Sequence, residues 1–132
     1  MKILLINGSP KGAKSNSLRL AHSFLDGIRD HESERERAVE VEELHLNTLQ
    51  IAPCKGCFAC WKQTPGTCCM EDDMQTVIEG LLSANLVIWS FPLYYYSVPG
   101  PLKTLIDRQL PMSLPFMCES RDGNGSGGHP SR

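Results

Sequence analysis

The sequence predicts an α/β protein built on a doubly wound parallel sheet, and two observations carry this prediction. Strand-like and helix-like segments alternate in the order strand, helix, strand, loop, helix, strand, helix. The segments "KILLIN" (2–7) and "LVIWSF" (86–91) are apolar along nearly their whole length, as expected of parallel strands covered on both faces. Right-handed crossovers place the strands in the order 2-1-3, which creates a ligand-binding switch point between strands 1 and 3.

The remaining elements are predicted from the spacing of apolar residues. Amphipathic helices are expected at three places along the chain: 17–30, a stretch that begins at 72 or 73, and 99–109. The second strand, 39–46, loses its alternation at Glu42 and Glu43, which indicates an edge strand. Asp72 and Gln75 predict a capping box at the start of the second helix.

The last predicted helix closes on Asp107 and Arg108, which we interpret as residues that cap or pair at its end. Beyond it the signal fades, so we divide the chain into a domain over 1–117 and a disordered or truncated tail over 118–132. The strand at 86–91 has the character of a central strand, yet no fourth strand follows it. The chain is therefore expected to stop partway through a larger sheet.

Charge and cysteine content limit the function classes. The net charge is -2 and no basic face stands out, so no nucleic-acid partner is expected. The apolar runs "ILLI" and "LVIW" are far too short to span a membrane, and "MKILLINGSP" lacks the pattern of a signal peptide. We expect a cytoplasmic protein without a membrane partner, in which clustered cysteines indicate metal or redox chemistry more than structural disulfides.

Two loops meet at the predicted switch point. "GSPKGAKSNS" (8–17) brings serine hydroxyls and an asparagine amide to the start of a helix, where free N–H groups suit a phosphate; it matches neither common nucleotide-binding glycine motif. "FPLYYYSVPGPLK" (91–103) brings aromatic and backbone groups to the same edge, where they can flank a planar ring. Each loop also has a plainer interpretation: a helix cap with a flexible turn, and tyrosines that pack on a neighbouring subunit. Together the two loops favour a phosphate-bearing aromatic ligand.

The cysteines are the third distinctive feature. Cys54, Cys57 and Cys60 have C-x2-C-x2-C spacing, and Cys68 follows with Cys69 beside it. Three close thiolates and a fourth just beyond are the ligand set of a 4Fe–4S cluster. Four thiolates also suit zinc, and ligand-free redox thiols are a further alternative. The sequence leaves the three open.

The segments "INGSPKGAKSNSLRLA", "CKGCFACW…PGTCCMEDDM" and "FPLYYYSVPGPLKTLIDR" resemble the flavodoxin-like NAD(P)H-dependent FMN reductases, and the cysteine pattern resembles the iron–sulfur flavoprotein branch. The resemblance covers about 1–117 and implies a flavodoxin-like sheet with FMN as cofactor. It also implies two further strands, 4 and 5, which this sequence is expected to lack. It implies that the FMN phosphate is held by the first loop, at Ser9, Lys11, Ser15, Asn16 and Ser17. It implies that the flavin ring and ribityl chain are held by the loop after the third strand, at Pro92, Leu93, Tyr94 and Tyr95.

The resulting hypothesis is an FMN-dependent NAD(P)H oxidoreductase or electron-transfer flavoprotein, with Cys54, Cys57, Cys60 and Cys68 as ligands of a 4Fe–4S cluster. No side chain is assigned as a catalytic acid or base. A small molecule or a protein is expected as electron acceptor, and a homo-oligomer if the fold is complete. Two alternatives stay open: a truncated, non-catalytic fragment that binds no flavin, and a zinc-stabilised interaction module.

Overall fold

The fold is a parallel sheet with helices on both faces. A computed structural model describes residues 1–116, 118–119 and 127–128 of the chain. Three strands form the sheet: β1 (Lys2–Asn7), β2 (Glu40–His45) and β3 (Leu86–Ser90). They are parallel and run in the order β2-β1-β3, with Ile3 opposite both Val41 and Leu86. The predicted fold class and strand order are confirmed, and β2 is the edge strand that its sequence indicated.

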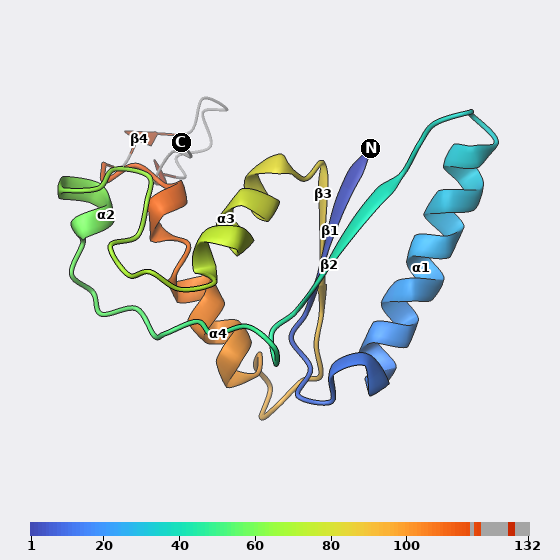
Figure 1. Ribbon diagram of the computed structural model, residues 1–132, viewed down its shortest axis with the longest axis horizontal. Coiled ribbons are helices and arrows are strands. Elements are labelled where there is room, and N and C mark those ends of the chain that lie inside the picture. Colours follow the sequence, from blue (N-terminus) through green and yellow to red (C-terminus); the bar gives the residue numbers. More distant parts are fainter. Residues whose placement is uncertain (117, 120–126, 129–132) are drawn as a thin grey trace.

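Strand β1 separates two apolar cores. Its residues 3–6 are all fully buried, and alternate side chains along a strand point to opposite faces. Ile3 and Leu5 pack with residues of helix α1 (Asn16–Ser33), while Leu4 and Ile6 pack with residues of α3 (Met74–Ser83) and α4 (Gly100–Asp107). Figure 1 shows the same layers, with α1 on one side of the sheet and α3 and α4 on the other.

Three short helices were not predicted. They are η1 (Gly12–Lys14) in the first loop, α2 (Ala59–Lys62) among the cysteines, and η2 (Leu110–Met112) after α4. Helix α1 also continues to Ser33, beyond its predicted end. Each of these segments is shorter or more polar than the apolar patterns on which the sequence predictions depend. None of the helices in the described part of the chain is long and apolar enough to cross a membrane.

The described parts of the tail form one small antiparallel pair, β4 (Cys118–Glu119) with β5 (Gly127–Gly128). The remainder of the predicted tail lies outside the described residues. Within the described ranges, β3 pairs with β1 alone, so one of its edges has no neighbouring strand there.

The predicted capping box at α3 is wrong. The side-chain amide of Gln75 donates to Glu79 instead of reaching back to the start of the helix. The Asp72 carboxylate accepts the Met74 N–H at 3.1 Å, and it also accepts a bidentate pair of bonds from Arg108, at 2.7 and 2.9 Å. A buried guanidinium competes more strongly for this carboxylate than a neutral capping partner does.

The Asp72–Arg108 pair ties three segments together. Arg108 is 1% exposed, and its Nη1 also donates to the Ala52 carbonyl oxygen at 2.6 Å. The Ala52 N–H in turn donates to Asp72 at 3.0 Å. The end of α4, the start of α3 and the chain that leads into the cysteines are thus joined at one point. Burial alone would raise the pKa of Asp72, but the Arg108 guanidinium and the N–H groups of Ala52 and Met74 outweigh it and lower that pKa.

Replacing Asp72 by asparagine is expected to lower the free energy of unfolding by about 3 kcal/mol at neutral pH, because Arg108 would keep a buried charge without its counter-charge. Since the folded-state pKa of Asp72 is lowered, its contribution is fully present above the unfolded pKa and is lost as the pH falls through the folded pKa. The difference in the free energy of unfolding between the wild type and the variant should therefore become smaller at acidic pH. Urea unfolding at several pH values measures both effects.

Asp107→Asn is the matched control, because Asp107 pairs with Lys103 at an exposed i,i+4 position on α4. Such a pair contributes less than about 0.5 kcal/mol. Equal losses of stability at positions 72 and 107 would contradict the assignment of the buried pair as the stronger contact.

Candidate functional site

The carboxyl ends of β1 and β3 are joined by a backbone hydrogen bond. The Gly8 N–H, directly after β1, donates to the carbonyl oxygen of Ser90 at 2.8 Å. A Cβ atom at Gly8 would lie 3.1 Å from the Leu102 side chain, so a glycine lets α4 pack closely against this turn. The loops after β1 and β3 consequently leave the sheet side by side, as the switch point requires.

Asn7 organises the first loop, and sequence reasoning assigned it no role. Its side chain is fully buried at the end of β1. The amide Nδ2 donates to the Gly12 carbonyl oxygen at 3.0 Å and contacts Nδ1 of His45 at 3.0 Å, while Oδ1 accepts the Ser9 N–H at 3.1 Å. A polar residue at the end of an apolar strand is the sequence pattern that could have identified Asn7.

The phosphate loop (8–17) is compact. Ser9 and Ser15 are each 3% exposed, whereas Lys11 and Asn16 are exposed. Ser15 occupies the N-cap position of α1, but its hydroxyl does not cap the helix and instead lies 2.7 Å from the hydroxyl of Ser17. All five predicted residues of this loop are therefore gathered in one turn at the start of an eighteen-residue helix. A helix N-terminus without a side-chain cap favours an anion.

The tyrosine loop (91–98) has unusual backbone geometry. Tyr94 and Ser97 exchange two backbone hydrogen bonds, at 2.9 and 3.0 Å, so that Tyr95 and Tyr96 form a two-residue turn. Their φ angles are 48° and 62°, in a region that turns of this kind usually fill with glycine or asparagine. Both side chains are 97% exposed. Two aromatic residues in left-handed backbone are strained, and such strain concentrates at ligand sites.

Ser90 is a second residue that sequence reasoning missed. It ends β3 between the two loops and is 4% exposed, and its hydroxyl has no hydrogen-bond partner among the described residues. A buried polar atom without a partner is rare and costs free energy unless a ligand or water satisfies it. The predicted ring residues Pro92, Leu93, Tyr94 and Tyr95 follow it directly. This edge of the sheet thus combines a free polar group, exposed aromatic rings and an uncapped helix, a set of groups that suits a phosphate-bearing aromatic cofactor.

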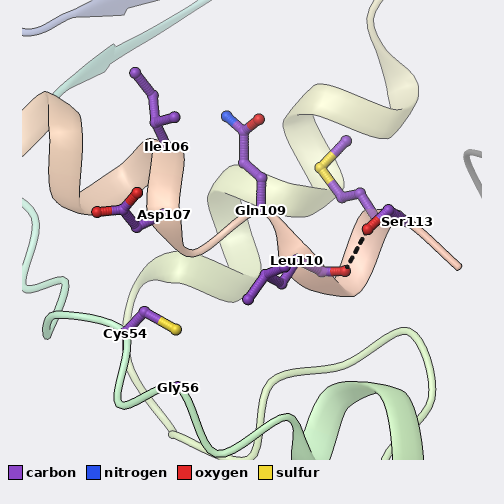
Figure 2. A pocket seen from close by; sticks show the side chains of 8 residues that line it. Cys54, Gly56, Ile106, Asp107, Gln109, Leu110 and Ser113 are labelled. Atoms are coloured by element: carbon purple, nitrogen blue, oxygen red, sulfur yellow. Dashed lines mark hydrogen bonds between the residues drawn. The ribbon is translucent and has the colours of Figure 1, made fainter. Parts of the chain in front are cut away.

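The cysteine loop (54–69) brings five thiols to one pocket. The pocket is tight, with a cavity volume of about 20 Å³, and its lining includes Arg108, Met70 and the five cysteines Cys54, Cys57, Cys60, Cys68 and Cys69. Positive φ angles at Gly56 (63°) and Phe58 (54°) turn the backbone between the first three of these cysteines. Cys54 also lines a second, more open hollow, and Figure 2 shows it facing Asp107, Gln109 and Leu110 there.

The thiols differ in their electrostatic environment. The Ala59 N–H and then the Cys69 thiol lower the pKa of Cys57, whose sulfur lies 3.7 Å from that of Cys69. Burial raises the pKa of Cys60, and the nearby charges of Cys68, Cys57 and Cys54 raise it further. Cys60 is thus the buried centre of the four predicted ligands, while Cys57 and Cys69 are the exposed pair.

The four predicted ligands are brought to one pocket, and Cys69 joins them as an unassigned fifth thiol. Within the described ranges, no group of three or more histidine, cysteine, aspartate or glutamate side chains has the geometry to hold a metal ion. The donor set in the pocket is rich in sulfur and poor in oxygen and nitrogen. Thiolates in this number fit an iron–sulfur cluster or zinc by chemistry.

Helix α4 connects the two candidate sites. It begins at Gly100, directly after the tyrosine loop, and ends at Asp107, where Asp107 and Arg108 line the cysteine pocket. Eight residues at 1.5 Å per residue give a length of roughly 12 Å. Figure 1 shows α4 running from the loops below the sheet toward the segment that carries α2.

Comparison with known proteins adds independent observations. Residues 1–129 match a family model described as a flavodoxin-like fold. An iron–sulfur flavoprotein of Archaeoglobus fulgidus is 37% identical over 108 residues, which are 82% of this chain and 48% of the relative. An iron–sulfur flavoprotein of Methanosarcina thermophila is 33% identical over 83% of this chain and 53% of the relative. An FMN-dependent NAD(P)H:quinone oxidoreductase of Pseudomonas aeruginosa is 29% identical over 87% of this chain and 56% of the relative. The chain spans about half the length of these curated relatives.

In protein freed of metal by chelation, Cys57 is expected to react with iodoacetamide several-fold faster than Cys60 near neutral pH. The reason is that the thiolate is the nucleophile, and Cys57 is exposed with a lowered pKa whereas Cys60 is buried with a raised one. The ratio of the two reaction rates should become smaller as the pH rises, because both thiols then ionise. Peptide mass spectrometry after timed quenching gives both rates. Unfolded protein serves as the control, where the two rates should converge; equal rates in the folded protein would contradict the assigned environments.

Proposed function

This chain belongs to the flavodoxin-like family, and from that premise we propose that it is an FMN-binding NAD(P)H oxidoreductase with a 4Fe–4S cluster on Cys54, Cys57, Cys60 and Cys68. The observation that carries the proposal is the pairing of two sites on one helix. The two loops that we propose for a phosphate-bearing ring meet just before α4, and a pocket of thiols lies at its end. The names of the relatives, iron–sulfur flavoprotein and FMN-dependent oxidoreductase, agree with such a pairing.

In the proposed FMN site, each loop has a separate role. Ser9, Lys11, Ser15, Asn16 and Ser17 would hold the phosphate, because they surround the uncapped start of α1. Pro92, Leu93, Tyr94 and Tyr95 would hold the ring and the ribityl chain, with the buried Ser90 hydroxyl as a further donor. When bound, FMN supplies hydride and single-electron chemistry, and the protein positions and tunes it.

In the proposed cluster site, the buried Cys60 lies at the centre of the ligand set. The charges of the other three predicted ligands act on its thiol. Phe58, Leu110 and Pro111 contribute apolar surface to the same pocket, which limits the access of water to the sulfurs. The proposed electron donor is NADH or NADPH, and the acceptor is a small molecule or a protein. A homo-oligomer and a cytoplasmic location remain part of the proposal.

Ligand-free thiols are the second candidate for the cysteine pocket. The 3.7 Å separation of the Cys57 and Cys69 sulfurs favours this alternative, since two exposed thiols so close together can form a disulfide when oxidised. Zinc bound by four thiolates is the third candidate. The iron–sulfur cluster, the ligand-free thiols and the zinc site predict different metal contents. Metal analysis of a single protein preparation therefore distinguishes them.

The first test is an absorption spectrum of protein purified without oxygen, with iron, sulfide and zinc measured on the same sample. The expected result is flavin bands with a broad shoulder near roughly 400 nm that bleaches with dithionite, and about four irons per chain. Cys60→Ser is expected to lose the iron and keep the flavin, while the matched variant Cys69→Ser keeps both. A protein that contains flavin but no iron would refute the cluster and leave the oxidoreductase standing. Zinc in the sample would favour the zinc site. The absence of flavin would refute the proposed oxidoreductase function.

The phosphate loop yields a separate expectation. FMN should bind at least about tenfold more tightly than riboflavin, which corresponds to about 1.4 kcal/mol. Ser17→Asp places a negative charge beside the phosphate and should weaken FMN binding by a similar factor, with a much smaller effect on riboflavin. Ser23→Asp, at an exposed position further along α1, is the matched control. Fluorescence titration measures all the affinities, and equal losses for FMN and riboflavin would contradict the role of this loop.

A further inference from the structure

Arg108 forms part of the wall of the cysteine pocket, and this placement is unusual for a buried cation. It is 1% exposed and lines the same pocket as the five thiols. Asp72 is its counter-ion, but Asp72 does not line that pocket. The guanidinium therefore lies between the carboxylate and the sulfurs, with its positive charge on the side of the cysteines.

The two sides of the Arg108 guanidinium also differ in their hydrogen bonds. Nη1 donates to Ala52 at 2.6 Å and to Asp72 at 2.7 Å, and Nη2 donates to the second oxygen of Asp72 at 2.9 Å. Nε is buried and has no hydrogen-bond partner in the part of the chain that the structure describes. A guanidinium offers five N–H donors in a rigid fork, so fixing the Nη side also fixes the direction of Nε–H.

A sulfur ligand would complete this arrangement. Cys68 lines the same pocket and lies near enough for its charge to act on the guanidinium. A buried donor without a partner costs free energy, so an acceptor at this position would stabilise the fold as well as the site. Hydrogen bonds to the sulfurs are one of the means by which a protein sets the potential of an iron–sulfur cluster.

We propose that Arg108 is a tuning residue of the cysteine site. Held in place by Asp72, it donates its Nε–H to a sulfur of Cys68 or of the bound cluster and raises the reduction potential of that cluster. The inference rests on the proposed function, because it assumes the iron–sulfur cluster. It adds a residue outside the ligand set, contributed by the end of α4, the helix that also borders the FMN crevice.

The test compares the two partners of the ion pair. Arg108→Gln removes a positive charge beside the cluster, so reduction becomes less favourable and the midpoint potential should fall. Asp72→Asn removes a negative charge behind the guanidinium, so the potential should rise. If Arg108 served the structure alone, both variants would break the same contact, loosen the same pocket and shift the potential in the same direction. Spectroscopic redox titration of the intact protein gives both values, with iron content as the check on occupancy.

Controls for the change in net charge lie on the same two helices. Lys103→Gln on α4 and Glu79→Gln on α3 each remove one charge from an exposed position outside the pocket lining. Neither is expected to move the potential measurably, because solvent and salt screen exposed charges. Shifts as large as those of Arg108→Gln and Asp72→Asn would overturn the proposal.

A measurement on the wild-type chain removes the dependence on folding of the variants. Protein labelled with ¹⁵N-arginine is reduced and studied by pulsed electron paramagnetic resonance, and a ¹⁵N coupling to the cluster is expected. The coupling should disappear when Arg108→Lys is labelled in the same way. Two results would overturn the inference and leave the proposed function standing. One is a wild-type protein that carries the cluster but shows no ¹⁵N coupling. The other is a pair of variants, Arg108→Gln and Asp72→Asn, whose midpoint potentials do not shift in opposite directions. A wild type without iron would instead refute the cluster itself, and the inference with it.

Discussion

The burial of β1 on both faces is the constraint from which the rest of the structure follows. Residues 3–6 have no exposed surface, and each such side chain contributes about 1.5–3 kcal/mol when removed from water. A strand covered on both faces needs helices on both sides and parallel partners on both edges. It therefore brings its own carboxyl end next to that of β3, and the loops that follow must share one crevice.

The cysteine loop depends on a different interaction. Apart from Ala59 and Cys60, few of its side chains are buried, so an apolar core cannot hold it in place. It is attached instead by polar contacts to the end of α4. Arg108 bonds the Ala52 carbonyl, and the indole N–H of Trp61 donates to the carbonyl oxygens of Leu110 and Ser113 at 3.0 and 3.1 Å. The thiols are thereby fixed relative to the sheet by a few directional bonds, each sensitive to the loss of one partner.

Helix α4 unites these two parts of the molecule. It packs on β1 through Leu102 and Leu105, which are fully buried, and this packing sets its position relative to the loops that follow β1 and β3. Its last residues then reach the cysteine pocket. In the proposed function, a short and rigid element thus holds a flavin site and a sulfur site at a fixed separation, which suits chemistry that links hydride and single-electron steps.

The sequence by itself determined the sheet, its strand order and the membership of both loops in one crevice, because apolar strands and handed crossovers leave few alternatives. It also identified the four clustered cysteines by their spacing. Only the tertiary structure decided the partners of Asp72 and Arg108, which local rules assigned to a capping box and a helix end. These residues are 36 positions apart, and a contact between distant segments leaves no periodic trace in the chain. The same reason hid the roles of Asn7 and Ser90, since the hydrogen-bonding state of a buried polar atom depends on what the fold packs around it.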